Sequence, residues 1–501
     1  MCFHAKGFLM INQNLGNIKT SIFYINDYHG KTLNMERTYA ASNAFDYRNK
    51  NNNTDTLKLS SGDIMLGEDV KINKAAILFQ NFIKVAASAI GNHEHDLQKE
   101  IGNVLPLVNY DLLSTNLKIN PRNPWARIVK SSVIKEINGN KYGIIGTTPI
   151  DLFTRTKSQS LQKDISIDNP METVADIQTE INKLQEQGVN KIILLSHLGN
   201  TMEKYIAAYT TGLDVILGGH SHNLIFDVKE GENLFYNRLG EPVIITQAGK
   251  DGKNFGILNL EFDNRGVIKK VQNNIGYTKD FRRNMAVQYI FNKLFGTSKV
   301  FGKINSAPAE PDNYLINPNP HGYFITDCMN KDLDAEISLI QAANIRGSFA
   351  SGDVDDRMIY DVLPFKNKLY KVKYCEKDIV DAVKFAAKSS FCSPDHKPGI
   401  LYVSGLKYTL NRYGDVRSIS FVDKNGKETP ININNPRIDK FYTTIVNDYC
   451  AQGNDNFSML NRPQNIIEKY SFDSGKCVEN ILSKSPNGLD IKDDGRIKFV
   501  N

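Results

Sequence analysis

The sequence predicts a large α/β domain followed by a smaller α+β domain. Over the first half of the chain, runs of β-branched and aliphatic residues are followed at once by short segments rich in His, Asp, Asn and Gly. Such runs are typical of buried strands in a mostly parallel sheet. In the second half, strand-like runs alternate with amphipathic helical stretches, which favours a separate unit of sheet and helix.

Four apolar runs carry the prediction for the first domain. SIFYI ends at Ile25, LKLS at Ser60, KIILL at Leu195 and DVIL at Leu217. In an open α/β sheet, the loops beyond the carboxyl ends of the strands converge on one crevice. We therefore expect the side chains just beyond these four positions to lie close together.

Six of the nine histidines lie in a set of short polar segments. The set is NDYHG (26–30), SGD (61–63), GNHEHD (91–96), SHLG (196–199) and GGHSH (218–222). Histidine is the commonest metal-binding side chain, and Asp and Asn supply oxygen ligands beside it. Two divalent ions ~3.5–4 Å apart can clamp the attacking and leaving oxygens of a phosphoryl group and lower the pKa of a bound water to ~7. The segments therefore predict a two-metal hydrolase site.

The residue types suggest how the ligands divide between two ions. Asp63 is the expected bridge, because one carboxylate can bind two cations at once. Asp27 and His29, two residues apart on one loop, would hold the first ion. The second ion would be held by Asn92, His197 and His220.

In this order and spacing, the five segments resemble the signature of calcineurin-like metallophosphoesterases. Over residues 20 to 480 the chain resembles the 5′-nucleotidase family, which includes periplasmic enzymes that also cleave UDP-sugars and has relatives that open 2′,3′-cyclic nucleotides. The resemblance implies a four-layer α/β/β/α sandwich over residues 20–280. It also implies a linker helix over 281–297 and a nucleotide-binding domain over 298–501.

Several site roles follow from the resemblance alone. His222 would complete the first metal site, and the two divalent ions would be zinc or manganese. His93 and Asp96 match the catalytic dyad of the family. His93 would stabilise charge on the phosphoryl oxygens or the leaving group, while Asp96 would orient the imidazole. His95 stands between them, and we expect it to lie in the neighbouring packing or at the rim of the site and not to bind metal.

The segments 341–349, 360–374 and 447–457 resemble the substrate-binding domain of the same family. Arg346 would grip a phosphate or carboxylate, while Phe365 and Tyr449 would sandwich a nucleobase. Asp455 would bind ribose hydroxyls, and Gln341 stands where family members commonly carry Asn. Without the metal-binding half, Phe365 and Tyr449 would be interpreted as structural residues; with it, the nucleobase sandwich is the better interpretation. Many relatives carry an arginine-bearing segment where this chain has PDNYLINPNPHGYFITD, which contains no arginine. We therefore expect fewer charged groups to hold the phosphate of the substrate.

One amphipathic helix is expected between the two domains. Its apolar residues fall at helical spacing, with Gly296 after the last of them: Val287, Ile290, Phe291, Leu294 and Phe295. Gly is common just beyond a helix end. The helix resembles the linker on which family members rotate their two domains. A loop is expected from Asp312 to Gly322, because that stretch is rich in Asn and Pro.

Composition excludes some classes of protein. The 501 residues carry 61 basic and 55 acidic side chains, a net charge of +6, with no basic stripe that would follow a nucleic acid. No apolar run approaches the ~18 residues of a membrane span. The six cysteines show no CxxC spacing and are expected to be free thiols. The family is usually periplasmic or on the cell surface, yet the first 20 residues contain no recognisable secretory signal.

Three hypotheses follow. The first is a nucleotidase that converts nucleoside 5′-monophosphates to nucleoside and phosphate. The second is cleavage of 2′,3′-cyclic nucleotides or UDP-sugars with the same metals. The third is a catalytically silent binding protein, against which the intact metal-site motifs argue. The partner would be a small nucleotide, with no nucleic acid, and the sequence leaves the oligomeric state open.

Overall fold

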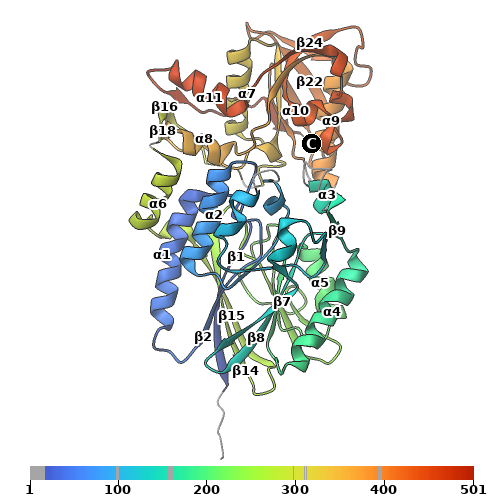
Figure 1. Ribbon diagram of the computed structural model, residues 1–501. Coiled ribbons are helices and arrows are strands. Elements are labelled where there is room, and N and C mark those ends of the chain that lie inside the picture. Colours follow the sequence, from blue (N-terminus) through green and yellow to red (C-terminus); the bar gives the residue numbers. More distant parts are fainter. Residues whose placement is uncertain are drawn as a thin grey trace, which may run out of the picture. The chain divides into compact units, whose positions relative to one another are not determined.

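The computed structural model describes residues 17–97, 101–155, 163–296, 298–309, 311, 313–392 and 398–500. The chain divides into two compact units, Met1–Phe291 and Asn292–Asn501, coloured blue to yellow-green and yellow to red in Figure 1. The segment 1–16, on which the expectation about a secretory signal falls, lies outside the described residues. Among the helices described, none is long and apolar enough to cross a membrane.

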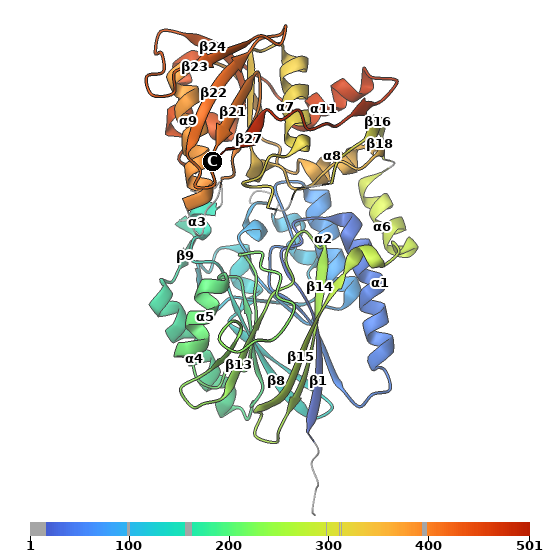
Figure 2. The same cartoon turned by 180° about the vertical axis from the view of Figure 1, so that it is seen from behind.

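The first unit is built on two large sheets (Figures 1 and 2). The seven-stranded sheet has the order β15 (Ile268–Tyr277), β14 (Asn254–Phe262), β1 (Ile18–Ile25), β2 (Asp55–Ser60), β3 (Ala87–Ala89), β4 (Asp111–Leu113) and β6 (Val129–Lys130). The six-stranded sheet has the order β12 (Leu234–Tyr236), β13 (Pro242–Thr246), β11 (Val215–Leu217), β10 (Ile192–Ser196), β8 (Asn140–Thr147) and β7 (Ser132–Ile137). A small sheet pairs β5 (Leu117–Ile119) with β9 (Ile165–Ile167).

The two large sheets share one core. Tyr24 and Leu59 of the first sheet lie in the same buried cluster as Leu195 and Leu217 of the second. The four predicted strands are present as β1, β2, β10 and β11, and β1 pairs with β2, and β10 with β11, in parallel. Their carboxyl ends therefore meet at one edge of each sheet, as expected for parallel strands.

Helices cover the outer faces of both sheets (Figure 1). Helices α1 (Thr32–Asn49) and α2 (Val70–Ile83) lie beside the first sheet, where Phe45 packs on Phe23 of β1 with ring centroids 5.6 Å apart. Helices α4 (Pro170–Glu186) and α5 (Asn200–Tyr209) form a buried cluster with the second sheet. A short helix, α3 (Leu152–Arg155), follows β8. This arrangement is the expected four-layer α/β/β/α sandwich.

The second unit is a mixture of sheets and helices around its own core. A five-stranded sheet has the order β20 (Leu401–Ser404), β17 (Ile337–Gln341), β24 (Phe441–Asn447), β19 (Leu369–Cys375) and β25 (Ile466–Lys469). A four-stranded sheet has the order β23 (Glu428–Ile431), β22 (Val416–Val422), β21 (Leu406–Leu410) and β27 (Ile497–Phe499), and a three-stranded sheet joins β18 (Gly352–Asp355), β16 (Val300–Ser306) and β26 (Leu489–Asp490). The helices are α7 (Pro320–Leu333), α8 (Asp356–Val362), α9 (Glu376–Cys392), α10 (Asp448–Ala451) and α11 (Ser474–Ser483).

Helix α6 (Met285–Phe295) contains the residues at which the two units divide. Val287 and Phe291 of the predicted apolar stripe are buried, and Gly296 follows the helix with a φ of +84°. The sequence predicts a loop over 312–322, but the last three residues of this range belong to helix α7 (Pro320–Leu333). Helix α7 begins at Pro320 because the Asn319 side chain accepts a hydrogen bond from the backbone N–H of His321 and caps the helix.

Candidate metal centre

The loops beyond the strand ends bring the predicted metal ligands together. Within the described residues there are three overlapping groups of possible ligands. Inside each group, the ligand atoms lie within 4.8 Å of one another. They are Asp27, His29 and His222; His29, Asp63 and His93; and Asp63, His197 and His220. The structure thus places at one point six of the seven side chains predicted to bind metal, together with His93.

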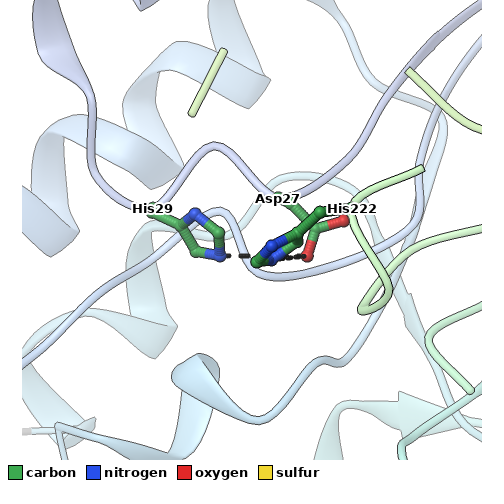
Figure 3. A group of neighbouring side chains, drawn as sticks. All are labelled: Asp27, His29 and His222. Atoms are coloured by element: carbon green, nitrogen blue, oxygen red, sulfur yellow. Dashed lines mark ion pairs between the residues drawn. The ribbon is translucent and has the colours of Figure 1, made fainter. Parts of the chain in front are cut away.

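The first group surrounds the Asp27 carboxylate. Figure 3 shows the imidazoles of His29 and His222 pointing toward this carboxylate. The Nε2 atoms of His29 and His222 lie 3.8 Å and 3.5 Å from Oδ1 of Asp27. Asp27 and His29 are almost fully buried, whereas the His222 side chain is 28% exposed. His222 therefore lies at the solvent side of this group.

Asp63 occupies the middle of the cluster. Its Oδ2 lies 3.1 Å from Nε2 of His197 and 3.6 Å from Nε2 of His29. Asp63 and His29 each belong to two of the three groups, and of these two side chains only the Asp63 carboxylate offers two ligand oxygens. Asn92, the seventh predicted ligand, lies beside this cluster, with its Oδ1 3.1 Å from Nδ1 of His220.

The donor set fits divalent cations. Atoms that bind one ion at ~2.0–2.2 Å lie ~3–4 Å from one another, which matches the distances around Asp27 and Asp63. Nε2 of His197 is buried and makes no hydrogen bond with any described residue, although two carboxylates lie near it. Imidazole nitrogens together with carboxylate and amide oxygens suit zinc and manganese.

The backbone of these loops is unusual. Five predicted ligands have a positive φ: Asp27 (51°), His29 (49°), Asp63 (51°), His220 (70°) and His222 (60°). This left-handed region is uncommon for residues other than Gly and costs on the order of 1–3 kcal/mol per residue. Such strain concentrates at functional sites, where the surrounding structure holds it in place.

The carboxylates dominate the electrostatics of the cluster. Burial opposes ionisation of Asp63, but His197 and His93 hold its pKa well below the usual value. Burial would also lower the pKa of His197, yet Asp63 and Asp27 raise it to about 10. The buried carboxylates therefore create a negative potential at this point, which favours bound cations.

Sequence reasoning missed four groups that hold the ligands in place. The Glu94 carboxylate accepts backbone N–H groups of Asp63 (2.9 Å) and Gly91 (2.7 Å). Carboxylate oxygens of Asp251 and Asp151 lie 2.9 Å from Nδ1 of His29 and 3.2 Å from Nε2 of His220. The carbonyl of Ser61 lies 2.6 Å from Nδ1 of His197. Glu94 is visible inside the GNHEHD segment, whereas nothing in the local sequence marks Asp151 or Asp251.

The predicted dyad is in contact. Nδ1 of His93 lies 2.7 Å from Oδ2 of Asp96, and the same oxygen accepts the backbone N–H of Gly67 at 2.8 Å. Nε2 of His93 lies 4.0 Å from Oδ2 of Asp63. The neighbouring His95 is buried, with its ring 5.3 Å from Trp125. His93 thus borders the metal cluster with one nitrogen held by Asp96, while His95 packs away from it.

In the second unit, the predicted substrate groups form three contacts. Gln341 donates from Nε2 to Oδ2 of Asp455 (3.0 Å), and the Tyr449 hydroxyl donates to Oδ1 of the same carboxylate (2.9 Å). The Arg346 guanidinium lies 5.4 Å from the centre of the Phe365 ring. Phe365 and Tyr449 are both half-buried, and neither belongs to the core cluster of the described residues.

The fold and the metal cluster together define a metallophosphoesterase. Residues 20–224 match the calcineurin-like phosphoesterase family, and residues 296–462 match the family described as 5′-nucleotidase, C-terminal domain. The chain therefore combines a calcineurin-like phosphoesterase domain with a 5′-nucleotidase C-terminal domain. Phosphoester hydrolases of this kind use divalent metal ions.

The curated relatives include two bacterial proteins. A probable 5′-nucleotidase of Treponema pallidum is 25% identical over 90% of this chain and 89% of that protein. A trifunctional nucleotide phosphoesterase of Bacillus subtilis is 23% identical over 96% of this chain, which spans 35% of that longer protein.

Solved structures share the whole fold. The 5′-nucleotidase precursor of Thermus thermophilus superposes with a TM-score of 0.78 at 22% identity, over 97% of this chain and 100% of that chain. A sulfate thiohydrolase of Thermus thermophilus superposes with a TM-score of 0.74 at 14% identity, over 96% and 97% of the two chains. The same fold thus occurs in proteins with different named activities, so the substrate has to be argued from the site.

Proposed function

We propose that this protein hydrolyses phosphate esters of nucleotides, with nucleoside 5′-monophosphates as the preferred substrates and nucleoside and inorganic phosphate as products. The observation that carries the proposal is the convergence of Asp27, His29, Asp63, His197 and His220 at the strand ends. The relatives named as 5′-nucleotidase and nucleotide phosphoesterase support a nucleotide as the substrate.

In this proposal each cation has four ligands. One cation is assigned to Asp27, His29, Asp63 and His222, and the other to Asp63, Asn92, His197 and His220. The mixture of nitrogen and oxygen donors favours zinc or manganese. When bound, two such cations would polarise the phosphoryl oxygens and acidify a water molecule.

The proposed catalytic work of the chain itself falls on His93 and Asp96. Because Asp96 contacts Nδ1 of His93, the ring is fixed and its Nε2 can donate toward a phosphoryl or leaving-group oxygen. Asp96 is in turn anchored by the backbone N–H of Gly67. This chain of contacts gives His93 a fixed direction without making it a metal ligand.

The proposed nucleoside site lies in the second unit. Phe365 and Tyr449 would stack on the base, and Asp455 would bind ribose hydroxyls. Arg346 and Gln341 would contact polar groups of the substrate. The support is that these side chains already contact one another in pairs, and that both rings lie outside the described core.

The test is phosphate release from a panel of substrates by protein treated with a chelator and then given back single metals. The panel contains AMP and other 5′-monophosphates, 2′,3′-cyclic nucleotides, UDP-glucose and a small aryl phosphate. We expect no turnover without metal, recovery with Mn²⁺ or Zn²⁺, and the highest kcat/KM on a 5′-monophosphate.

The outcomes separate the alternatives. Faster turnover of a cyclic nucleotide or UDP-glucose would replace the nucleotidase by a phosphodiesterase or a UDP-sugar hydrolase with the same metals. A metal-loaded protein that turns over no member of the panel would contradict an enzyme of this class and favour a binding protein.

A further inference from the structure

Asp251 is a buried acidic residue that none of the predicted ligand sets includes. It lies in the turn between β13 and β14, more than 220 positions away from Asp27 along the sequence. Its side chain is only 5% exposed. A carboxylate is costly to bury unless charged or hydrogen-bonding groups compensate it, so its partners indicate what it does.

Asp251 contacts the loop that carries Asp27 and His29. Oδ1 of Asp251 lies 2.9 Å from Nδ1 of His29. The backbone N–H of Asp251 donates to the carbonyl of Asp27 at 2.6 Å, and its own carbonyl accepts Nδ2 of Asn34 at 2.8 Å. One residue therefore contacts both Asp27 and His29.

The contact selects one form of the imidazole. An ionised carboxylate accepts a hydrogen bond from Nδ1–H, which leaves Nε2 of His29 unprotonated and directed at Asp27 and Asp63. A carboxylate on the far nitrogen of a metal-binding histidine fixes the ring and raises its basicity.

We propose that Asp251 is a positioning residue that fixes the tautomer and orientation of His29 for metal binding. The inference rests on the proposed function, because it needs His29 to bind a cation. Asp251 itself touches neither substrate nor metal in this assignment. Loss of its charge should therefore weaken one of the two metal sites and leave the other almost unchanged.

Asp251→Asn is the most informative variant. Asp251 has a φ of +59°, a conformation that Asn tolerates better than Ala does. Asn also preserves the backbone contacts, so the variant removes the charge and little else. The control is Asp263→Asn. Asp263 accepts backbone N–H groups in the turn between β14 and β15 and contacts no predicted ligand in the described structure.

The readout is the affinity for Mn²⁺, measured by titration calorimetry on chelator-treated full-length protein, with melting curves of the metal-depleted form. For Asp251→Asn we expect the dissociation constant of one site to rise about 10–100-fold, the usual effect of removing such a partner. The other site should stay within about twofold, and Asp263→Asn should match the parent. Asp251→Glu, which keeps the charge, should recover part of the affinity.

Three results would overturn the inference in distinguishable ways. A parent protein that binds Mn²⁺ at two sites, and an Asp251→Asn variant that binds it equally well, would exclude the positioning role alone. A parent that binds no divalent cation would remove the proposed function together with this inference. Asp251→Asn could also lower the melting temperature of the metal-depleted protein, and a loss of Mn²⁺ affinity could then come from the lower stability. In that case Asp251→Glu decides, because it keeps the charge. Equal Mn²⁺ affinities of Asp251→Glu and Asp251→Asn would contradict a role for the charge.

Discussion

The Asp63 carboxylate contacts the metal cluster through both of its oxygens. Its Oδ1 accepts the backbone N–H of His93 at 2.9 Å, while Oδ2 faces His197 and His29. Gly91 lies directly against it, since a Cβ at position 91 would be 2.1 Å from Oδ1 of Asp63. Any residue with a side chain at position 91 would therefore collide with the Asp63 carboxylate.

Removing the Asp63 charge should affect both proposed metal sites. We expect Asp63→Asn to retain less metal than a change at the peripheral ligand His222, because only Asp63 would touch both ions. Turnover should fall by orders of magnitude. Elemental analysis of the dialysed variants measures the metal content, and full occupancy with near-normal turnover in Asp63→Asn would contradict a bridging role.

His93 should act on the reaction and not on the metal. We expect His93→Ala to lower kcat by ~10²–10⁴, the range for a positioned acid or base, while metal content stays at the parent level. The reason is that Nδ1 of His93 contacts Asp96, which leaves only Nε2 to face the substrate. A His93→Ala protein that loses metal would instead identify His93 as a ligand.

At the scale of single elements, helix α4 illustrates how local signals set stability. Asn169 caps it by accepting the backbone N–H of Glu172 at 3.0 Å, and the Glu172 side chain accepts the N–H of Asn169 at 3.1 Å. This capping box satisfies donors that a helix start leaves unpaired. The helix supports the second sheet through Ile181 and Leu184, at a distance from the predicted ligands.

Asn169→Ala should therefore cost stability and leave catalysis intact. Loss of a cap of this type destabilises by ~0.5–2 kcal/mol. Urea unfolding followed by circular dichroism should show a lower midpoint for the first unit, while kcat/KM on the best substrate stays unchanged. Asn169→Asp keeps an acceptor at the same place and should remain near the parent. Equal midpoints for all three proteins would mean that the cap contributes nothing measurable.

At the scale of the whole molecule, the two units have different proposed tasks. The first holds the metal cluster, and the second holds the aromatic and polar groups for the nucleoside. A substrate without a base should then need only the first. This division can be tested by changing the second unit alone and comparing substrates with and without a nucleobase.

Changing Phe365 and Tyr449 together to Ala should separate the two tasks. Stacking of a base on an aromatic side chain is worth ~1–3 kcal/mol, so the double variant should lose most of its kcat/KM on AMP. Hydrolysis of a small aryl phosphate should stay near the parent. Parallel losses on both substrates, with a lower melting temperature, would mean that the two rings have a structural role instead.

The sequence alone was sufficient to predict the strands and the segments that follow them. Alternation between apolar runs and polar loops is a local property, so β1, β2, β10 and β11 and the residues just beyond them could be identified without coordinates. The prediction of a loop through Asn319 and Pro320 was wrong at its end, because an Asn followed by Pro can begin a helix as readily as it continues a loop.

Only the tertiary structure decided what supports the metal ligands. Asp251 contacts His29, and Asp151 contacts His220, across more than 60 positions of sequence. Such contacts depend on which strands are neighbours and on left-handed backbone at single residues, and neither leaves a pattern in the nearby sequence. The residue type of a ligand determines which atoms it can offer to a metal, and the sequence shows this directly. Its orientation depends on contacts with side chains that are distant in the sequence, and only the tertiary structure shows these.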